Sequence, residues 1–533
     1  MSRRIFCLVL VAGLTTGLAD VAQAQGSYLG PIVPTAGHAE ALLPPARSQG
    51  QFDPRYQQLE QRVHNLEVRR LPQVAEPSYF SAFTRGASVA DELEEIRGEV
   101  IEQGAAIESI EGDVSKLGKR KVDAGTSNNT MKVSGRIHAD YWGFPDSSTA
   151  TNILETNNPN MSPQDRILFR RIRFGVAGDV GDNMQYKIEM EFAEGNDVEF
   201  RDVYLGFDHL PIAQTLLIGN QKRPYGLDHL NSSRYNIFLE RPFVVEGYNE
   251  DTRRVGIASY GVSPELFFNW RYGVYNMRKI ADEGAYINDD LQLEFASRLA
   301  STYWYDETSD GRGYAHFAVS GTMAYPDGTA PNNGTQDNEA RFRTRPEARS
   351  SERWLDTGRI AGASRYQLLG FEKGLNIGPV QFIGEYQNVW LHRDSGFGAS
   401  RDLHFHGGYV YVNYMLTGEH VPWERDSGTL GRLKPFEDFF LVRRIRGGVG
   451  GGWGAWGVGL RYSHGDFTDY DIMGGVADSY TLALNWWWNA NARMQFNYIN
   501  GYLKERGPLS GENFTGQLAG DYDIIGTRFL IDF

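Results

Sequence analysis

The residues of this sequence best suited to binding a ligand are arginines, because many of them alternate with apolar residues along the chain. In a β-strand, alternate side chains point to opposite faces, so each of these arginines lies opposite its apolar neighbours. A guanidinium group offers a planar fork of donors to phosphate or carboxylate and keeps its charge near neutral pH. The arginines on the polar face of such alternating segments are Arg136, Arg171, Arg173, Arg254, Arg271, Arg298, Arg461, Arg493 and Arg528.

The elements that must position these arginines are amphipathic strands, as the last stretch of the chain illustrates. Ile525, Phe529 and Phe533 share one face of it, while Arg528 and Asp532 share the other. Strands that bury an apolar face in lipid must close into a barrel, because an open edge leaves backbone groups without hydrogen bonds. About sixteen such segments begin near Val133, Leu168, Tyr186, Val198, Thr215, Arg253, Leu266, Leu291, Tyr314, Tyr366, Pro379, Gly407, Ala455, Ser479, Arg493 and Asp523. The sequence therefore predicts an all-β fold, a transmembrane antiparallel β-barrel of about sixteen strands over residues 131–533.

The composition agrees with a membrane barrel. The chain has 533 residues, a formal net charge of -14 and 41% hydrophobic residues. Only alternate residues of a barrel strand face lipid, so such a protein needs no long apolar run. No stretch of about 18 apolar residues follows the N-terminal segment, which excludes transmembrane helices. An acidic chain also gives no indication of a nucleic-acid partner.

The first 130 residues follow other patterns. Residues 1–24 are expected to be a secretory signal peptide, with Arg3 and Arg4 before an apolar run and Ala22 to Ala24 at its end. The single cysteine, Cys7, lies inside it, so the mature protein is expected to have no disulfides. Residues 25–88 are a linker rich in Pro, Ala and Gly with a short heptad start.

Residues 89–120 carry a heptad pattern. Its core positions are Val89, Leu93, Ile96, Val100, Gln103, Ile107, Ile110, Val114 and Leu117. Four heptads with one polar core residue predict a self-associating coiled coil. The alternative is a single amphipathic helix packed on a domain, but the sequence shows no adjacent soluble core for it to cover.

The connections between the predicted strands alternate in length. Short ones lie at 178–183, 261–265 and 489–491, and long ones at 143–166, 222–252 and 326–365. Short turns of such barrels face the periplasm and long loops face outward. The connection 417–454 is long where a short turn is expected, and the strand pattern gives no reason for its length.

Seven segments in the barrel region resemble the phosphate-selective porin O and P family. They are F-R-R-I-R-F-G at 169–175, K-R-P-Y-G-L-D-H-L-N-S-S at 222–233, F-L-E-R at 238–241, R-P-E-A-R at 345–349, W-L-D-T-G-R at 354–359, Y-M-L-T-G-E at 414–419 and L-N-W-W-W-N-A-N-A-R-M-Q-F-N-Y at 484–498. The resemblance implies a homotrimeric porin of the bacterial outer membrane with a periplasmic coiled coil. It further implies a water-filled channel for small anions such as phosphate, with the loop 222–252 folded inward as a constriction.

The candidates for anion binding follow from the constriction loop and the strand faces. They are Arg223, Arg234 and Arg241 in the loop, and Arg171, Arg173, Arg254, Arg271 and Arg298 on the strands. The alternative is that such arginines only pair with lumenal acids, which are Asp140, Glu189, Glu191, Asp202, Glu294 and Glu385. A further cluster, Arg341, Arg343, Arg345 and Arg349, belongs either to an outer vestibule or to a solvated loop.

Two other functions compete with an anion pore. A general or cation-preferring porin for small hydrophilic solutes requires acids to outweigh the arginines at the narrowest point. An outer-membrane barrel enzyme requires a nucleophile, a base and an acid on one rim, and the sequence shows no such constellation, so no catalytic residue is predicted.

The remaining motifs predict neither a metal nor a cofactor. The G-x-G-x-x-G pattern at 452–457 precedes a strand instead of the helix that a nucleotide site needs. His404 and His406 share a strand face but lack a clear third ligand.

Overall fold

The computed structural model describes residues 129–193, 198–249, 253–280, 292–326, 340–394, 401–439, 442–443 and 448–533. All of these residues belong to one compact unit of the chain. The predicted signal peptide, linker and coiled coil, 1–24, 25–88 and 89–120, lie outside the described residues. In the described part of the chain, no helix is long and apolar enough to cross a membrane.

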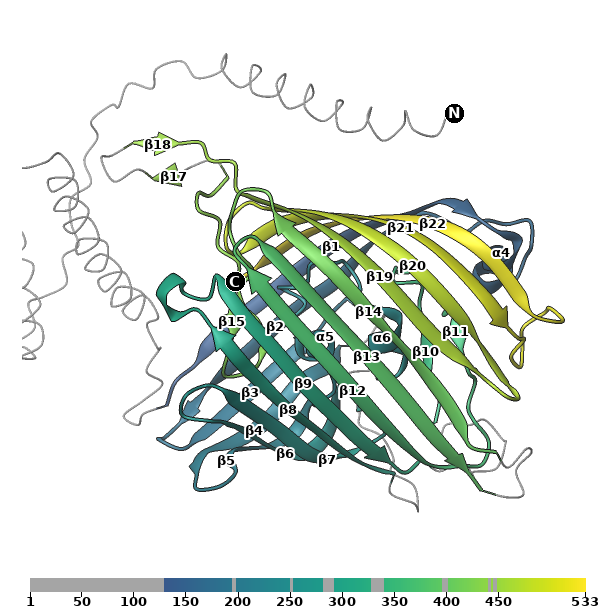
Figure 1. Cartoon of the computed structure of the whole chain (residues 1–533), viewed down its shortest axis with the longest axis horizontal. Helices are drawn as coiled ribbons and strands as arrows, with labels where there is room; N and C mark the ends of the chain where they lie inside the picture. Colours follow the sequence, from purple (N-terminus) through teal and green to yellow (C-terminus); the bar gives the residue numbers. More distant parts are fainter. Residues whose placement is uncertain are drawn as a thin grey trace, which may run out of the picture. The chain divides into compact units, whose positions relative to one another are not determined.

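Sixteen of the described strands form one closed antiparallel barrel, as predicted (Figure 1). The first and last strands pair with each other, for example Ile137 with Ile531, and this pairing closes the sheet. In chain order the barrel strands are β1 (Lys132–Ser147), β2 (Arg166–Val180), β3 (Met184–Glu191), β4 (Glu199–Leu210), β5 (Gln214–Lys222), β6 (Arg253–Val262), β7 (Phe268–Asn276), β8 (Leu293–Tyr305), β9 (Gly313–Ala324), β12 (Ala363–Ile377), β13 (Val380–Arg393), β14 (Leu403–Met415), β19 (Ala455–Asp469), β20 (Ile472–Trp487), β21 (Ala492–Arg506) and β22 (Leu518–Asp532).

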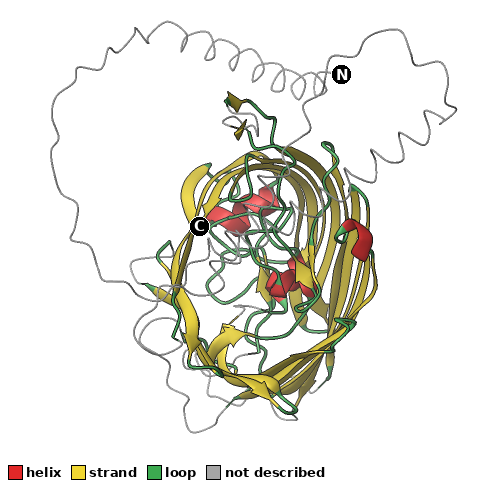
Figure 2. Cartoon of the chain, turned by 90° about the vertical axis from the view of Figure 1, so that its left-hand side faces the viewer, coloured by secondary structure: helices red, strands yellow, loops and turns green. Residues whose placement is uncertain are grey.

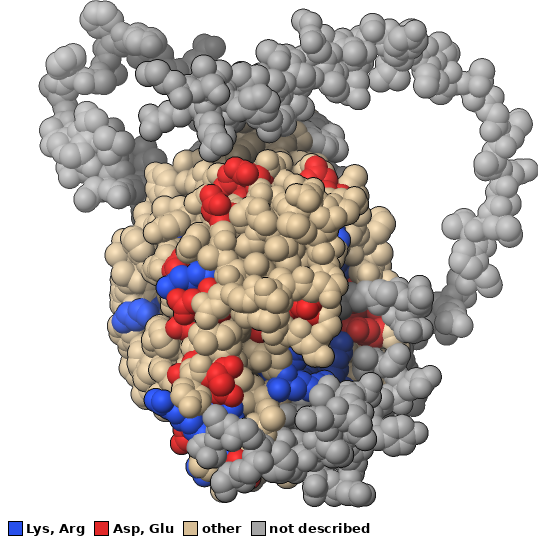
Figure 3. Space-filling view, turned by 90° about the vertical axis from the view of Figure 1, so that its right-hand side faces the viewer, with Lys and Arg blue, Asp and Glu red and all other residues tan. Residues whose placement is uncertain are grey.

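The predicted alternation of faces is confirmed in the closing strand. Phe529 and Ile531 are 39% and 40% exposed, whereas Arg528 and Leu530 are 1% and 2% exposed. The outward residues form an apolar wall suited to lipid. Figure 3 looks from the right-hand side of Figure 1, where Lys, Arg, Asp and Glu side chains lie in scattered groups. The predicted start at Ser479 is too late, because β20 begins at Ile472 with a stretch in which Gly474 and Gly475 hide the alternation.

The connections alternate in length as expected, with two departures. Only Gly378 and Pro379 join β12 to β13, whereas the segment after β5 holds two helices, α5 (Leu227–Leu230) and α6 (Phe243–Gly247). At the end with the long loops, Tyr470 and Asp471 alone join β19 to β20. At the opposite end, the connection from β14 to β19 is long, and it carries the strand pairs β15 (Trp423–Glu424) with β16 (Thr429–Leu430) and β17 (Val442–Arg443) with β18 (Val449–Gly450).

Loops and short helices fill much of the space inside the ring of strands (Figure 2). Besides α5 and α6, they include the strand pair β10 (Arg343–Thr344) with β11 (Leu355–Asp356) from the connection between β9 and β12. Two further short helices, α4 (Thr149–Thr156) and η2 (Glu307–Ser309), belong to other connections. The buried core of the protein therefore lies inside the barrel, where inward-folded segments meet the inner wall.

Candidate pore and anion-binding cavities

The connection from β5 to β6, described over 223–249 and called the inward loop below, is held against the inner wall of the barrel. The backbone N–H groups of Leu227 and Asp228 donate to the two carboxylate oxygens of Glu385 on β13, at 2.9 and 2.7 Å. The Tyr409 hydroxyl donates to the same carboxylate at 2.5 Å. Glu385, expected to pair with an arginine, thus accepts hydrogen bonds from the start of α5.

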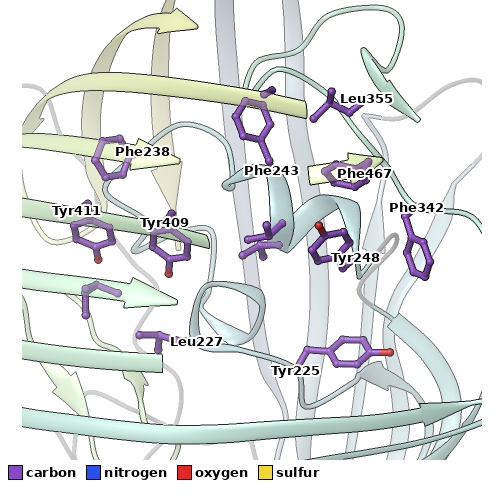
Figure 4. Close-up of a cluster of buried hydrophobic side chains, with 14 of the residues drawn as sticks. Tyr225, Leu227, Phe238, Phe243, Tyr248, Phe342, Leu355, Tyr409, Tyr411 and Phe467 are labelled. Carbon is purple, nitrogen blue, oxygen red and sulfur yellow. The ribbon is translucent and has the colours of Figure 1, made fainter. Parts of the chain in front are cut away.

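The middle of the inward loop is fixed by an apolar anchor, which consists of Phe238 and Leu239. These side chains are only 4% and 2% exposed. The Phe238 ring lies edge to face with Tyr411, with centroids 5.4 Å apart (Figure 4). A glycine at 459 leaves room for this contact, since a Cβ there would lie 3.3 Å from the Phe238 ring.

Ion pairs with arginines hold the following residue, Glu240, in place. Its carboxylate accepts from Arg170 Nε at 2.8 Å and from Arg528 Nη2 at 2.7 Å. Burial alone would raise the pKa of Glu240, but the charges of Arg170, Arg528 and Arg171 hold it well below its usual value. Arg528 also pairs with Asp140 at 2.6 Å. This buried network ties the inward loop to both strands at the closure of the barrel.

A second loop, 340–362 between β9 and β12, also reaches the inner wall. The buried carboxylate of Glu347 accepts from Arg461 Nη2 and from the Ser479 hydroxyl, each at 2.8 Å. It also accepts from the backbone N–H of Phe243 in the inward loop, at 3.2 Å. Arg461 therefore holds this loop against the inner wall, through an acid that the sequence had not indicated as its partner.

The long connection between β14 and β19 supplies a third internal segment, 416–439, called the rim segment below. The Trp423 indole N–H donates to Thr302 Oγ1 at 2.9 Å, and Trp423 stacks on Tyr314 with centroids 5.1 Å apart. Further along, the backbone N–H of Leu430 donates to Asn231 Oδ1 at 3.0 Å, so the rim segment touches the inward loop. The unexplained length of this connection thus corresponds to a segment that enters the barrel from the end with the short turns.

Two of the predicted anion-binding arginines hold the rim segment. Arg298 donates to the carbonyls of Ser427 and Gly428, at 3.2 and 2.8 Å, and pairs with Glu372 at 2.6 Å. Arg271 donates to the Ser427 carbonyl at 3.2 Å. The structure places both residues at this contact and in the lining of none of the cavities described below.

The main cavity has a volume of about 620 Å³ and a strongly basic lining. Fifteen Lys and Arg side chains line it, against four carboxylates. The cations are Arg136, Arg170, Arg171, Arg173, Lys187, Arg201, Lys222, Arg234, Arg241, Arg253, Lys279, Arg343, Arg345, Arg349 and Arg353. The carboxylates are Glu189, Asp202, Glu240 and Glu246. Burial and the nearby charge of Arg170 lower the pKa of Arg349 to about 10, which leaves it charged at neutral pH.

Several of these cations are partly neutralised by acids on the wall. Arg136 pairs with Glu189 at 2.9 Å, Arg173 with Glu191 at 2.6 Å, and Arg253 with Asp202 at 2.5 Å. The alternative that lumenal arginines pair with lumenal acids is therefore correct for these pairs. The cations nevertheless outnumber the acids in the lining of the cavity.

One lining arginine was missed because the strand alternation breaks at a bulge. His138 pairs with Arg171, and the next residue, Ala139, pairs with Phe169, so Arg170 is an extra residue in β2. A bulge re-aims side chains, and Arg170 and Arg171 both line the cavity. Arg201, Lys222, Arg253, Lys279 and Arg353 also line the cavity and were not predicted. Alternation gives no signal for Arg201 or Arg253, because it assigns their neighbours Asp202 and Arg254 to the lumenal face.

A smaller cavity, of about 190 Å³, shares Lys279 and Arg343 with the main cavity. Its other lining residues are Arg223, Tyr248, Arg254, Met277, Arg341, Phe342, Arg359 and Tyr366. Arg223 pairs with Glu294 at 2.6 Å, and Arg254 donates to the carbonyl of Met277 at 2.5 Å. Of the eight predicted anion-binding residues, Arg171, Arg173, Arg234 and Arg241 thus line the main cavity and Arg223 and Arg254 line the smaller one.

A narrow crevice of about 20 Å³ lies near the end with the short turns. Arg234, Arg432 and Arg493 line it together with Asp532, which pairs with Arg234 at 2.9 Å and with Arg432 at 3.0 Å. Arg493 is 2% exposed, and none of its three guanidinium nitrogens has a hydrogen-bond partner among the described residues. Arg234 also lines the main cavity, so its side chain lies between the two spaces.

The histidine pair on β14 lies on the outer face of the barrel. The rings of His404 and His406 stack with centroids 5.3 Å apart, and His464 lies 5.9 Å from His406. No group of three His, Cys, Asp or Glu side chains within the described ranges has an arrangement that holds a metal ion.

Comparisons with known proteins place these features in a family. A model of the family described as phosphate-selective porin O and P matches residues 131–532. An uncharacterized protein of Caulobacter vibrioides is 25% identical over 377 residues, which cover 68% of each chain.

Solved barrels show a general likeness. OmpT of Vibrio cholerae, in its trimer form, has 11% identity and a TM-score of 0.46, with 76% of this chain and all of that chain covered. An anion-selective porin from Comamonas acidovorans has 13% identity and a TM-score of 0.44, covering 76% and 99%. The outer-membrane channel DcaP of Acinetobacter baumannii has 11% identity and a TM-score of 0.44, covering 78% and 99%.

Proposed function

Because the chain belongs to the phosphate-selective porin O and P family and is an outer-membrane channel rather than an enzyme, we propose that it conducts small anions, phosphate among them. The observation that carries the proposal is the main cavity, in which fifteen cations face four carboxylates. Fixed positive charge along a pore lowers the barrier for anions and excludes cations. The cation-preferring alternative needs the opposite balance, and the acids of this cavity are outnumbered.

We propose further that anions leave the main cavity past Arg234 toward Arg493. An arginine that is buried without a hydrogen-bond partner is costly to a fold, because its desolvation is not offset by hydrogen bonds. A passing anion supplies the missing acceptor at Arg493. With the short turns in the periplasm, this route runs from the outer loops through the main cavity to the periplasmic end.

Binding of phosphate in the main cavity is supported by the geometry of guanidinium groups. Arginine donates two parallel hydrogen bonds to a phosphate or carboxylate, which a halide cannot accept in the same way. In the main cavity, Arg345 and Arg349 come from one loop, and Arg170, Arg171 and Arg173 come from one strand. A tetrahedral anion among these groups meets donors from several directions.

The test is the reversal potential across a planar bilayer in a potassium chloride gradient, followed by titration of the chloride current with phosphate. An anion-signed potential with saturable block by phosphate is expected. The double variant Arg345→Gln with Arg349→Gln is expected to reduce both, while Arg401→Gln removes an exposed charge outside the cavities and serves as the control. A cation-signed potential overturns the proposal, and an anion-signed potential without block overturns its phosphate arm.

The assembly is proposed to be a homotrimer that residues 89–120 hold together as a periplasmic coiled coil. The support is the heptad pattern with its largely aliphatic core. Replacing Ile96, Val100 and Ile107 by polar residues is expected to weaken the oligomer. Unchanged migration on native gels would show that the barrels associate without the coiled coil.

A further inference from the structure

The smaller cavity offers an anion a different environment from that of the main cavity. Three aromatic side chains, Tyr248, Phe342 and Tyr366, are among its lining residues. No Phe, Tyr or Trp lines the main cavity, whose apolar lining residues are Leu230 and Val245. The two spaces share Lys279 and Arg343, so an anion in the main cavity lies next to an aromatic compartment.

Every charged residue that lines the smaller cavity is a cation. The six are Arg223, Arg254, Lys279, Arg341, Arg343 and Arg359. The carboxylates that pair with some of them, Glu294 with Arg223 and Asp356 with Arg341, each at 2.6 Å, are not part of the lining. A ligand in this space therefore meets positive charge and no acidic group of the lining.

The aromatic residues are packed so that edges and faces meet at right angles. The Phe342 ring lies 6.0 Å from Tyr248, with planes 84° apart, and 5.4 Å from Tyr366, with planes 79° apart. All three are at most 4% exposed, and Figure 4 shows Phe342 beside Tyr248 in the internal cluster. The Tyr248 hydroxyl lies 2.7 Å from the carbonyl oxygens of both His406 and Asp466, and its single hydrogen can be donated to either of them, which fixes the ring.

On the premise of the anion pore above, we propose that the smaller cavity binds small aromatic anions, with an aromatic ring among Tyr248, Phe342 and Tyr366 and a carboxylate or phosphate group on the arginines. A cavity of about 150 Å³ is large enough for benzene, and this one has about 190 Å³. The channel thereby favours an aryl carboxylate or aryl phosphate over an aliphatic anion of the same charge.

The test compares benzoate, cyclohexanecarboxylate and acetate on the full-length protein. Each is titrated against the chloride current in planar bilayers, and its dissociation constant is measured by ligand-observed NMR in detergent. A favourable aromatic contact corresponds to about a 2- to 12-fold difference in affinity. Benzoate is therefore expected to bind about 2- to 12-fold more tightly than cyclohexanecarboxylate, whose ring is similar in size but not aromatic.

Three variants locate the site. Phe342→Leu keeps an apolar side chain and is expected to abolish the preference for benzoate over cyclohexanecarboxylate. Arg359→Gln, which changes the smaller cavity alone, is expected to weaken benzoate binding. Arg349→Gln, from the same loop but lining only the main cavity, is the matched control and should keep the preference.

The outcomes separate this site from the anion pore itself. Equal affinity for benzoate and cyclohexanecarboxylate in the unaltered protein overturns the aromatic site, and an anion-signed reversal potential in the same preparation leaves the pore proposal standing. A benzoate preference that survives both Phe342→Leu and Arg359→Gln overturns the placement in the smaller cavity. A cation-signed potential with a benzoate preference that Phe342→Leu removes supports the binding site and overturns only the anion pore.

Discussion

The Arg528 guanidinium donates a hydrogen bond to the Glu240 carboxylate at 2.7 Å, and this contact joins the last strand of the barrel to the inward loop. The same guanidinium pairs with Asp140 of β1 at 2.6 Å. Since β1 and β22 are the strands whose pairing closes the barrel, one side chain couples the closure of the barrel to the position of the loop inside it.

Removing the charge of Glu240 is expected to loosen the inward loop. Glu240→Gln preserves the shape of the side chain but removes the carboxylate that pairs with Arg170 and with Arg528, although Arg528 keeps Asp140. Breaking a buried ion pair costs about 3–5 kcal/mol. Protease cleavage within 223–249 should increase, and single-channel currents should become larger and noisier. Glu505→Gln, which breaks an exposed pair with Lys504, is the control and should change neither. Equal protection of the loop in both variants would contradict the role of Glu240.

The Glu240 carboxylate also predicts how the protection of the inward loop changes at low pH. The pKa of Glu240 is held well below its usual value by Arg170, Arg528 and Arg171, against the effect of burial. A carboxylate with a lowered pKa stabilises the fold fully above its unfolded value of about 4.3, and this stability is lost as the pH falls through the folded pKa. Loop protection is therefore expected to stay constant from neutral pH down to about 5 and to fall only below about 4. In Glu240→Gln, this loss of protection at low pH should be absent. If the loop loosened between pH 7 and 5 instead, the pH dependence would belong to another titrating group.

Local alternation was enough to predict the barrel and many of its lumenal arginines. In β22 every second residue from Ile525 onward faces outward, and nothing further along the chain is needed to assign Arg528 to the lumen. Alternation fails at Arg170, because the bulge depends on pairing with β1, which no short stretch of β2 encodes.

The contacts of Arg298 could not be predicted from the sequence for a different reason. Its acceptors, the carbonyls of Ser427 and Gly428, lie about 130 positions away in the rim segment. Turn and loop residues show that a connection is long, but not that it folds into the barrel. A strand face therefore predicts that an arginine is lumenal, whereas its task depends on which segment occupies the lumen beside it.

Arg493 is expected to lower the stability of the barrel and to increase its anion conductance. Its guanidinium is buried with no hydrogen-bond partner in the described part of the chain, and such a group costs about 1–3 kcal/mol or more. Arg493→Met should therefore raise the thermal stability of the barrel and reduce chloride conductance. Arg461→Met is the matched comparison, because Arg461 pairs with Glu347 at 2.8 Å and its loss should destabilise by about 3–5 kcal/mol. If Arg493→Met destabilised the barrel to the same extent, Arg493 would be a structural residue and not part of the anion route.

The rim segment is expected to limit the current from the end with the short turns. Trp423 is 5% exposed, stacks on Tyr314 and donates to Thr302, so it fixes this segment inside the barrel. Trp423→Ala removes contacts that are typically worth about 3–5 kcal/mol for a buried tryptophan, which should release the segment and raise single-channel conductance. Trp453→Ala changes an 80% exposed side chain of the same connection and should leave conductance unaltered. Replacing residues 419–436 with a two-residue turn should raise conductance at least as far as Trp423→Ala. If neither change raised it, the narrowest point would lie at the inward loop alone.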